Sequence, residues 1–255
     1  MIRFTVVTIT YNAAPVLQPT LDSVLAQSYA NVEHWIIDGR STDNTVAMAE
    51  DYRRQTELQG SSHVVCIQSE PDRGLYDAMN KGLALATGDY IVFLNAGDAF
   101  PSADTLLHVA DCVKLGGPLP GVLYGFTDIV DSERRFIAHR RLQPPAHLSW
   151  RSFCRGMLVC HQAFYARADI AKNNPYDLRY RFSADVDWCI RVMRESRRRR
   201  LKLVRVNEVV ANYLDGGMTN KNHRASLIER FHVMARHYGL VTTLLMHLWF
   251  VVRRR

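Results

Sequence analysis

The sequence lacks the cysteine patterns that mark disulfide frameworks and small metal-binding modules. Its five cysteines are scattered over 255 residues, and no two of them form a CxxC pair. The N-terminus also lacks the charged, apolar and small-residue series of a signal peptide. We therefore expect a reduced, cytoplasmic protein without structural disulfides.

Three motifs that bind phosphate or supply a nucleophile in α/β enzymes are absent too. No GxGxxG follows the first β-rich run, and neither GxxxxGK[ST] nor GxSxG occurs. These absences argue against dinucleotide-dependent hydride transfer, P-loop nucleotide hydrolysis and the α/β-hydrolases. Zinc-finger and RNA-binding signatures are missing as well, so we expect no nucleic-acid partner.

The apolar segment LVTTLLMHLWFVV, at 240–252, is too short to span a bilayer unaided, and it runs into three arginines. It could lie on a membrane surface, or pack as a terminal helix in the fold or in a homodimer. The net charge is +7, and a second arginine run lies at 197–200. Such basic patches favour anionic lipid or phosphorylated substrates as partners.

Short β-rich runs alternate with helical patterns over the first hundred residues. We expect strands at 4–12, 34–39, 63–69 and 90–94, and helices at 15–27, from about 43 to 58, and at 75–86. This alternation predicts an α/β fold with a mainly parallel sheet, whose ligands lie at the carboxyl ends of the strands. Those ends carry Tyr11, Asn12, Asp38, residues 70–73 and residues 95–98.

The second half is less regular. Its patterns predict strands at 122–130, 136–142, 201–206 and 209–214, and helices at 163–171 and 183–196. From Ser226 onward, four apolar side chains fall on one stripe of an amphipathic helix, namely Leu227, Phe231, Met234 and Tyr238.

The stretch FLNAGD, at 93–98, ends an apolar strand on an amide and a carboxylate. Asn, Gly and Asp together are common in ordinary turns. Oxygen ligands such as Asp98 and, more weakly, Asn95 could instead hold a divalent cation beside a diphosphate, and they would suit Mg or Mn better than zinc.

The order of several motifs resembles the family 2 glycosyltransferases, in particular bacterial enzymes of the colanic acid type that build exopolysaccharide repeat units. The motifs are TITYN (8–12), IIDGRSTDNT (36–45), SEPDRGLYDAMNKGLALATGDYIVFLNAGD (69–98), HQAFYAR (161–167) and FSADVDW (182–188). The resemblance implies a GT-A fold over 1–220, with a nucleotide-sugar-binding half (1–100) and an acceptor-binding half (101–220). A helical tail follows at 221–255.

The same resemblance assigns the nucleotide-sugar donor, a UDP- or GDP-sugar, to the strand ends. It implies that Thr10 and Asn12 line the base pocket, that Asp38 bonds the base or ribose, and that Asp72 and Arg73 lie beside the nucleotide. Residues 95–98 occupy the place of the family's DxD metal motif. Asn95 and Gly97 stand where the family has acids, which leaves Asp98 as the carboxylate for the cation. Arg73, His161 or the adjacent Gln162 could then assist at the diphosphate or the acceptor.

The family's catalytic base corresponds to Asp185 in FSADVDW. Inverting transfer needs a carboxylate that takes the proton of the attacking hydroxyl. Asp187 lies two residues further on, and positions two apart on a helix diverge by about 200 degrees, so both acids cannot face one hydroxyl. The alternative is that both are first-turn acids favoured by the helix dipole.

We therefore expect an inverting, metal-dependent glycosyltransferase that acts on a glycan or lipid-diphosphate-linked acceptor in bacterial surface polysaccharide synthesis. Such an acceptor would place the protein at the inner face of the cytoplasmic membrane. Two alternatives stay open: a nucleotidyltransferase, and a non-catalytic module that binds nucleotide sugars or polysaccharide.

Overall fold

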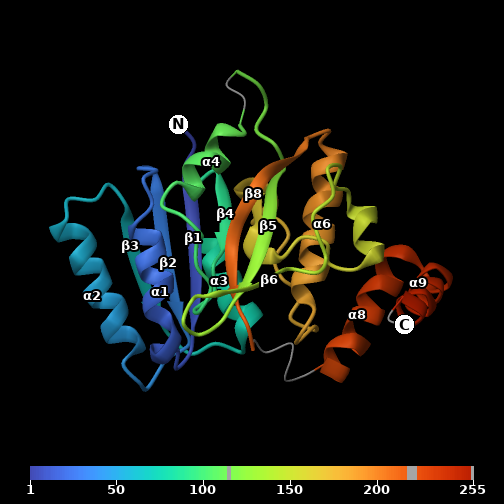
Figure 1. The fold of residues 1–255 in the computed structure, drawn as a ribbon, viewed down its shortest axis with the longest axis horizontal. Helices are drawn as coiled ribbons and strands as arrows, with labels where there is room; N and C mark the ends of the chain where they lie inside the picture. The colour runs from blue at the N-terminus through green and yellow to red at the C-terminus, as the bar shows by residue number, and fades with distance from the viewer. Residues whose placement is uncertain (114–115, 217–222, 254–255) are drawn as a thin grey trace.

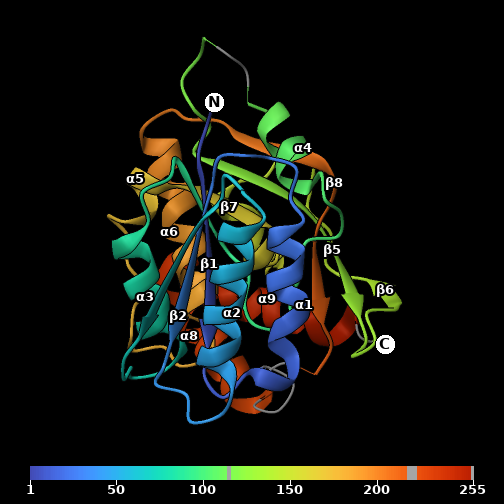
Figure 2. The same ribbon diagram turned by 90° about the vertical axis from the view of Figure 1, so that its left-hand side faces the viewer.

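One eight-stranded sheet with helices on both faces organises the molecule (Figures 1 and 2). The structure, a computed structural model, describes residues 1–113, 116–216 and 223–253. The strand order is β3-β2-β1-β4-β7-β5-β6, and β8 pairs with β5. Helices α3, α5 and α6 lie on one side of the sheet, and α1 and α4 lie on the other (Figure 2).

The first half has the predicted alternation of strands and helices. Its elements are β1 (Phe4–Thr10), α1 (Ala14–Leu25), β2 (Val32–Asp38), α2 (Thr45–Leu58), β3 (Val64–Ser69), α3 (Leu75–Leu85) and β4 (Tyr90–Phe93). All four strands run parallel. The register places Thr10 opposite Asp38 and Asp38 opposite Ser69, so the polar residues after these strands meet at one edge of the sheet.

Two glycines allow close packing around β1. A Cβ on Gly82 would lie 2.5 Å from the Val7 side chain, so only glycine lets α3 approach the strand this closely. A Cβ on Gly88 would lie 2.7 Å from the Arg3 carbonyl oxygen. The turn between α3 and β4 is therefore pressed against the start of β1, which fixes the direction of α3 and of the loop before it.

The second half mixes strand directions. Its elements are α4 (Thr105–Asp111), β5 (Val122–Val130), β6 (Phe136–His139), two 3₁₀ helices η1 (Trp150–Arg155) and η2 (His161–Ala163), β7 (Phe164–Arg167), α5 (Ala168–Ala171), α6 (Ala184–Arg198) and β8 (Leu203–Leu214). Strand β7 runs antiparallel to both β4 and β5, and β8 runs parallel to β5.

Three expectations for the second half were wrong. Residues 163–171, expected to be helical, contain β7 and only the short α5. Three of the four residues of β7 are buried, so no polar alternation marks the segment as a strand. The runs at 201–206 and 209–214 form one strand, β8, with irregular register against β5, and α4 was not expected at all.

The C-terminal tail contains α8 (His223–Tyr238) and α9 (Leu240–Arg253). Helix α8 packs on the domain through Val233 and Met234, which are buried. The ring of Tyr238 stacks on Trp150 of η1, with 5.7 Å between ring centroids. Helix α8 is thus part of the fold, whereas α9 lies at its far end (Figure 1). No helix among the described residues is long and apolar enough to cross a membrane.

Candidate functional site

Asp38 is the centre of a hydrogen-bond network at the carboxyl ends of β1, β2 and β3. Its carboxylate accepts bonds from Thr10 Oγ1 at 2.9 Å, from Ser69 Oγ at 2.6 Å, and from both the backbone N–H (2.9 Å) and the hydroxyl (2.5 Å) of Ser41. Burial alone would raise the pKa of Asp38, but these bonds outweigh it and lower the pKa. The acid therefore stays ionised and holds three strand ends together.

The loops around Asp38 are also tied to one another. Asn12, in the left-handed region with φ 48°, accepts a hydrogen bond from Thr42 N at 2.9 Å and donates its own N–H to Ser41 Oγ at 2.8 Å. Asp72 lies against Gly39, where a Cβ would come within 2.5 Å of its carboxylate. Arg73 is exposed and pairs with Asp77 at 3.0 Å. The structure thus brings the predicted Thr10, Asn12, Asp38 and Asp72 to one edge.

Asp98 is buried at the turn that follows β4. Its side chain accepts hydrogen bonds from Gln162 Nε2 at 2.8 Å and from Leu214 N at 3.1 Å, and only 4% of the residue is exposed. Burial raises the pKa of Asp98 to about 6, although the bond from Gln162 acts in the opposite direction. Thr20 and Arg134 bond the carbonyl oxygens of Asp98 and Gly97 and fix the turn.

Helix η2 joins the predicted metal residue to the predicted base. Gln162 bonds Asp98, and the adjacent His161 contacts Asp185, with 3.4 Å between Nδ1 and the carboxylate. The other ring nitrogen, Nε2, lies 3.1 Å from Asn95 Nδ2. With the Asn95 amide donating, the imidazole proton is on Nδ1, the nitrogen that faces Asp185. The two carboxyl groups therefore contact neighbouring residues of one short segment.

Asp185 stands in the first turn of α6 and is partly exposed, with 17% of its side chain accessible. Tyr76, at the start of α3, donates its hydroxyl to Asp185 at 3.2 Å. Burial acts to raise the pKa of Asp185, but the contact with His161 outweighs it, so the pKa is lowered. An ionised carboxylate that is accessible and held by two side chains can accept a proton from a bound hydroxyl.

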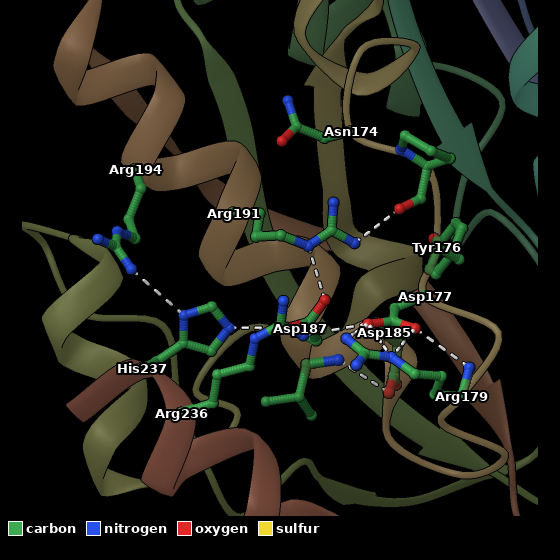
Figure 3. A network of polar contacts seen from close by, with 12 residues as sticks. Asn174, Tyr176, Asp177, Arg179, Asp185, Asp187, Arg191, Arg194, Arg236 and His237 are labelled. Carbon is green, nitrogen blue, oxygen red and sulfur yellow. Dashed lines mark hydrogen bonds and ion pairs between the residues drawn. The ribbon is translucent and has the colours of Figure 1, made fainter. Parts of the chain in front are cut away.

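Asp187 lies on a different face of α6 and is fully buried. One carboxylate oxygen accepts a bond from Arg191 at 2.6 Å and the other a bond from His237 of α8 at 2.7 Å (Figure 3). Burial acts to raise its pKa, yet these partners lower it. The structure places Asp185 beside His161 and Asp187 between two helices, so it does not bring the two acids to one substrate hydroxyl.

The donor set around residues 95–98 does not fit a resident metal ion. Both oxygens of Asp98 already accept hydrogen bonds from the protein, and Gly97 offers no side chain. Among residues 1–113, 116–216 and 223–253, no three His, Cys, Asp or Glu side chains are arranged to hold a cation. The buried side-chain oxygen of Asn95, Oδ1, has no hydrogen-bond partner among the described residues.

Sequence reasoning missed Tyr76, Arg134 and Glu229. Tyr76 and Arg134 reach the site only because separate chain segments fold together, and no local pattern marks them. Glu229 of α8 accepts hydrogen bonds from backbone N–H groups that precede α6. It did carry a signal, because it is the sole acid among the last 33 residues.

Comparisons with known proteins agree with this architecture. Residues 5–168 match the family model described as Glycosyl transferase family 2. A "PGL/p-HBAD biosynthesis glycosyltransferase" of Mycobacterium bovis is 33% identical over 235 residues, covering 91% of this chain and 85% of that protein. The amylovoran biosynthesis glycosyltransferase AmsB of Erwinia amylovora is 30% identical over 220 residues, covering 83% of this chain and 69% of that protein.

Solved structures share the fold at low identity. S. aureus TarS residues 1–349 in complex with UDP-GlcNAc superpose with a TM-score of 0.70 at 15% identity, covering 97% of this chain and 73% of that one. The mannosyltransferase PcManGT from Pyrobaculum calidifontis, in complex with GDP-Man and Mn²⁺, gives 0.64 at 18% identity, with coverages of 96% and 74%. These matches confirm the expected GT-A fold.

Proposed function

Because this chain belongs to glycosyltransferase family 2, we propose that it moves a sugar from a nucleotide-sugar donor to an acceptor hydroxyl with inversion at the anomeric carbon. The observation that carries the proposal is the position of Asp185. It is an ionised, accessible acid, bonded to Tyr76 from the first half and in contact with His161, whose neighbour Gln162 bonds the turn after β4.

The proposed step is a direct displacement. The acceptor oxygen attacks the anomeric carbon, the bond from that carbon to the phosphate oxygen breaks, and the nucleoside diphosphate leaves with the electron pair. Asp185 takes the proton of the acceptor hydroxyl. Tyr76 remains a hydrogen-bond donor throughout, because burial and the neighbouring Asp185 raise its pKa well above the usual value. His161 keeps Asp185 ionised before the attack.

The edge formed by β1, β2 and β3 is the proposed nucleotide site. Four protein donors already occupy the carboxylate of Asp38, so a base or ribose would bond it by displacing a serine hydroxyl, and Ser41 and Ser69 are the ones that can rotate. Asn12, Asp72 and Arg73 border the same edge. The structural neighbours TarS and PcManGT are complexes with UDP-GlcNAc and GDP-Man, which makes UDP- and GDP-sugars the first donors to try.

Asp185→Asn tests the proposed base, because the amide keeps the shape of the side chain and removes the proton acceptor. We expect turnover to fall about 10²- to 10⁴-fold, while UDP or GDP binding, measured by calorimetry, stays within about twofold. A variant that keeps its turnover would exclude Asp185 as the base.

A panel of nucleotide sugars separates the remaining alternatives. Sugar transfer with release of nucleoside diphosphate supports the proposal. Exchange of pyrophosphate into the nucleotide sugar would indicate a nucleotidyltransferase instead. Nucleotide-sugar binding without any turnover, whichever acceptor is offered, would indicate the non-catalytic module.

The divalent cation expected from the sequence stays a prediction, and no step above uses one. With Asp98 fully hydrogen-bonded, we expect Mn²⁺ or Mg²⁺ alone to leave the melting temperature of EDTA-treated protein unchanged. A cation brought in by a nucleoside diphosphate would raise the melting temperature only when UDP or GDP is also present. A shift with Mn²⁺ alone would show that the protein has a metal site of its own.

We further propose a lipid-linked acceptor reached at an anionic membrane surface. Six aliphatic side chains of α9 are 53–72% exposed and form one continuous face at 100 degrees per residue: Leu240, Val241, Leu244, Leu245, Leu248 and Val252. The last 33 residues contain six arginines and one acid. A second copy of the chain would double this excess of positive charge, whereas anionic lipid would neutralise it. The run at 197–200 contributes less, because Arg198 and Arg199 pair with Glu195.

Vesicle sedimentation tests this surface. Wild type should bind vesicles that contain anionic lipid, and the double substitution Leu244→Glu with Leu248→Glu should abolish that binding without unfolding the protein. Equal binding by the two forms would remove α9 from the proposal, and a concentration-dependent dimer that the double substitution dissolves would assign the face to self-association.

A further inference from the structure

We propose that Glu229 of α8 is a positioning residue for Asp185. Its carboxylate accepts three consecutive backbone N–H groups immediately before the acid: Arg181 N at 2.9 Å, Phe182 N at 2.6 Å and Ser183 N at 3.1 Å. This inference rests on the proposed role of Asp185 as the base. It assigns a function in the reaction to a helix outside the family match at 5–168.

The three N–H groups fix the direction in which the chain enters α6. Ser183 is the N-cap residue of α6, yet its side chain makes no capping bond and instead donates to Ser226 O of α8 at 3.2 Å. Helix α8 therefore supplies both a carboxylate and a carbonyl to the segment that a local cap would otherwise hold. Asp185 follows two residues later, so a shift of this segment moves the carboxylate away from His161 and Tyr76.

Glu229 is not needed to attach α8 to the domain. Val233 and Met234 are buried under the helix, and His237 bonds the buried Asp187. Arg236 reaches Asp177 at 3.1 Å (Figure 3). These contacts lie one to two turns beyond Glu229. They hold α8 in place independently, so the Glu229 carboxylate acts on the entry to α6 and not on the docking of the helix.

A carboxylate bonded to three N–H groups is hard to replace. Charge-assisted bonds to backbone amides are shorter and stronger than neutral ones, and the negative charge also suits the N-terminal end of α6. An amide side chain at 229 keeps one acceptor and the same shape. An alanine removes both acceptors and leaves the three N–H groups to water or to a new conformation.

The experiment compares Glu229→Ala and Glu229→Gln with wild type, and with Glu195→Gln as a matched control. Glu195 is an acid at the opposite end of α6 that pairs with Arg198 and Arg199, so its substitution also removes a paired carboxylate from this helix region. We expect kcat to fall about 10- to 100-fold in the alanine variant, because small misplacements of a reacting group are costly, and by less in the glutamine variant. KM for the donor should stay within about twofold, and the control should match wild type.

Two readouts do not require activity. Hydrogen exchange of the peptide that contains residues 181–186 should become faster in Glu229→Ala and remain slow in the control. The NMR chemical shifts of the His161 ring should change in Glu229→Ala, because Asp185 moves away from the imidazole. Both effects should be larger in Glu229→Ala than in Glu229→Gln, in the same order as the loss in kcat.

The proposal is overturned if Glu229→Ala and Glu229→Gln both keep kcat within twofold of wild type, or if the NMR chemical shifts of the His161 ring do not change in Glu229→Ala. If Glu229→Ala does not fold, the same measurements on Glu229→Gln decide whether the proposal holds. An Asp185→Asn enzyme that stays active would instead exclude Asp185 as the base, and with it the proposed function. If Glu229→Ala is slow while Asp185→Asn stays active, the bonds from Glu229 to the entry of α6 support turnover in a way that does not involve Asp185.

Discussion

The nucleotide edge, formed by the loops after β1, β2 and β3, and the α6–α8 cluster around Asp185 and Asp187 hold their acids in different ways. At the nucleotide edge, Asp38 is bonded by hydroxyls and a backbone N–H, all from the first 69 residues. In the α6–α8 cluster, Asp187 is bonded by the cationic Arg191 and by His237, which is 50 residues away. One region holds its acid with neutral donors, and the other holds its acid with ionisable side chains.

The difference shows how each region can be disturbed. Neutral hydroxyls can rotate to accommodate a ligand, so the nucleotide edge should tolerate single changes and adapt to different bases. Ion pairs between buried groups lose far more when one partner is removed, because the remaining charge stays desolvated. We therefore expect the α6–α8 cluster to be the more fragile part of the molecule.

The largest effect should come from Asp187→Ala. Removing this fully buried carboxylate takes the partner from Arg191, whose side chain is 22% exposed, and from the buried His237, which should lower the free energy of unfolding by about 3–5 kcal/mol. Denaturant titration measures the loss, and Asp51→Ala, which breaks an exposed pair with Arg54, serves as the control. A loss below about 1 kcal/mol would show that the α6–α8 cluster is no more sensitive to substitution than the edge around Asp38.

Asp98 should give stability a characteristic pH dependence. Burial raises the pKa of Asp98 to about 6 in the folded state, well above its ordinary value near 3.8, so the folded protein holds the proton more tightly. The resulting stabilisation is fully present below about pH 4 and is lost as pH rises through 6, by about 3 kcal/mol at 1.4 kcal/mol per pKa unit. The stability difference between wild type and Asp98→Asn should therefore favour wild type more at pH 4 than at pH 7. A difference that does not change with pH would place the pKa of Asp98 near its ordinary value.

Asp38→Asn should have a smaller effect on stability and a specific effect on binding. The amide loses one acceptor site among four donors, which should cost about 1–3 kcal/mol of unfolding free energy at pH 7. We expect the Kd for UDP or GDP, measured by calorimetry, to rise about tenfold or more. An unchanged Kd would show that the hydrogen-bond network of Asp38 is not part of the nucleotide-binding site.

Arg73→Gln should have the smallest effect, with no change in stability and a change in donor binding alone. Within the described part of the chain, Arg73 pairs with Asp77 alone, and its side chain is 78% exposed, so the melting temperature should not change. If the guanidinium reaches the donor diphosphate, KM for the nucleotide sugar should rise several-fold at constant kcat, and less so at high salt. An unaltered KM would leave Arg73 as a surface charge.

The sequence allowed the meeting of these strand ends at one edge to be predicted, and the reason is physical; nucleotide binding there stays a prediction. The parallel strands β1 to β4 are short apolar runs separated by helical patterns, and in a parallel sheet their carboxyl ends must meet. Thr10, Asn12, Asp38 and Asp72 therefore came to one edge as expected. Asp185 was found from a motif, and its contacts with His161 and Tyr76 became visible only in the structure.

The remaining features depend on contacts that no local pattern encodes. Strand β7 looks like any buried segment, because both of its neighbours, β4 and β5, are supplied by other parts of the chain. The same holds for Arg134, which bonds Gly97 from a hairpin 37 residues away. The turn at 95–98 was expected to present Asp98 to a cation, whereas the structure turns that carboxylate inward to Gln162 and Leu214.

The attachment of α8 to the entry of α6 also determines when the molecule becomes competent during its synthesis. Chains fold from the N-terminal end as they emerge, so the first hundred residues can pair their strands early. Glu229 follows Arg181, Phe182 and Ser183 by 46 to 48 residues, so these bonds can form only after α8 has been synthesised. A nascent chain that lacks α8 would thus complete the network around Asp38 before the entry to α6 is held in place.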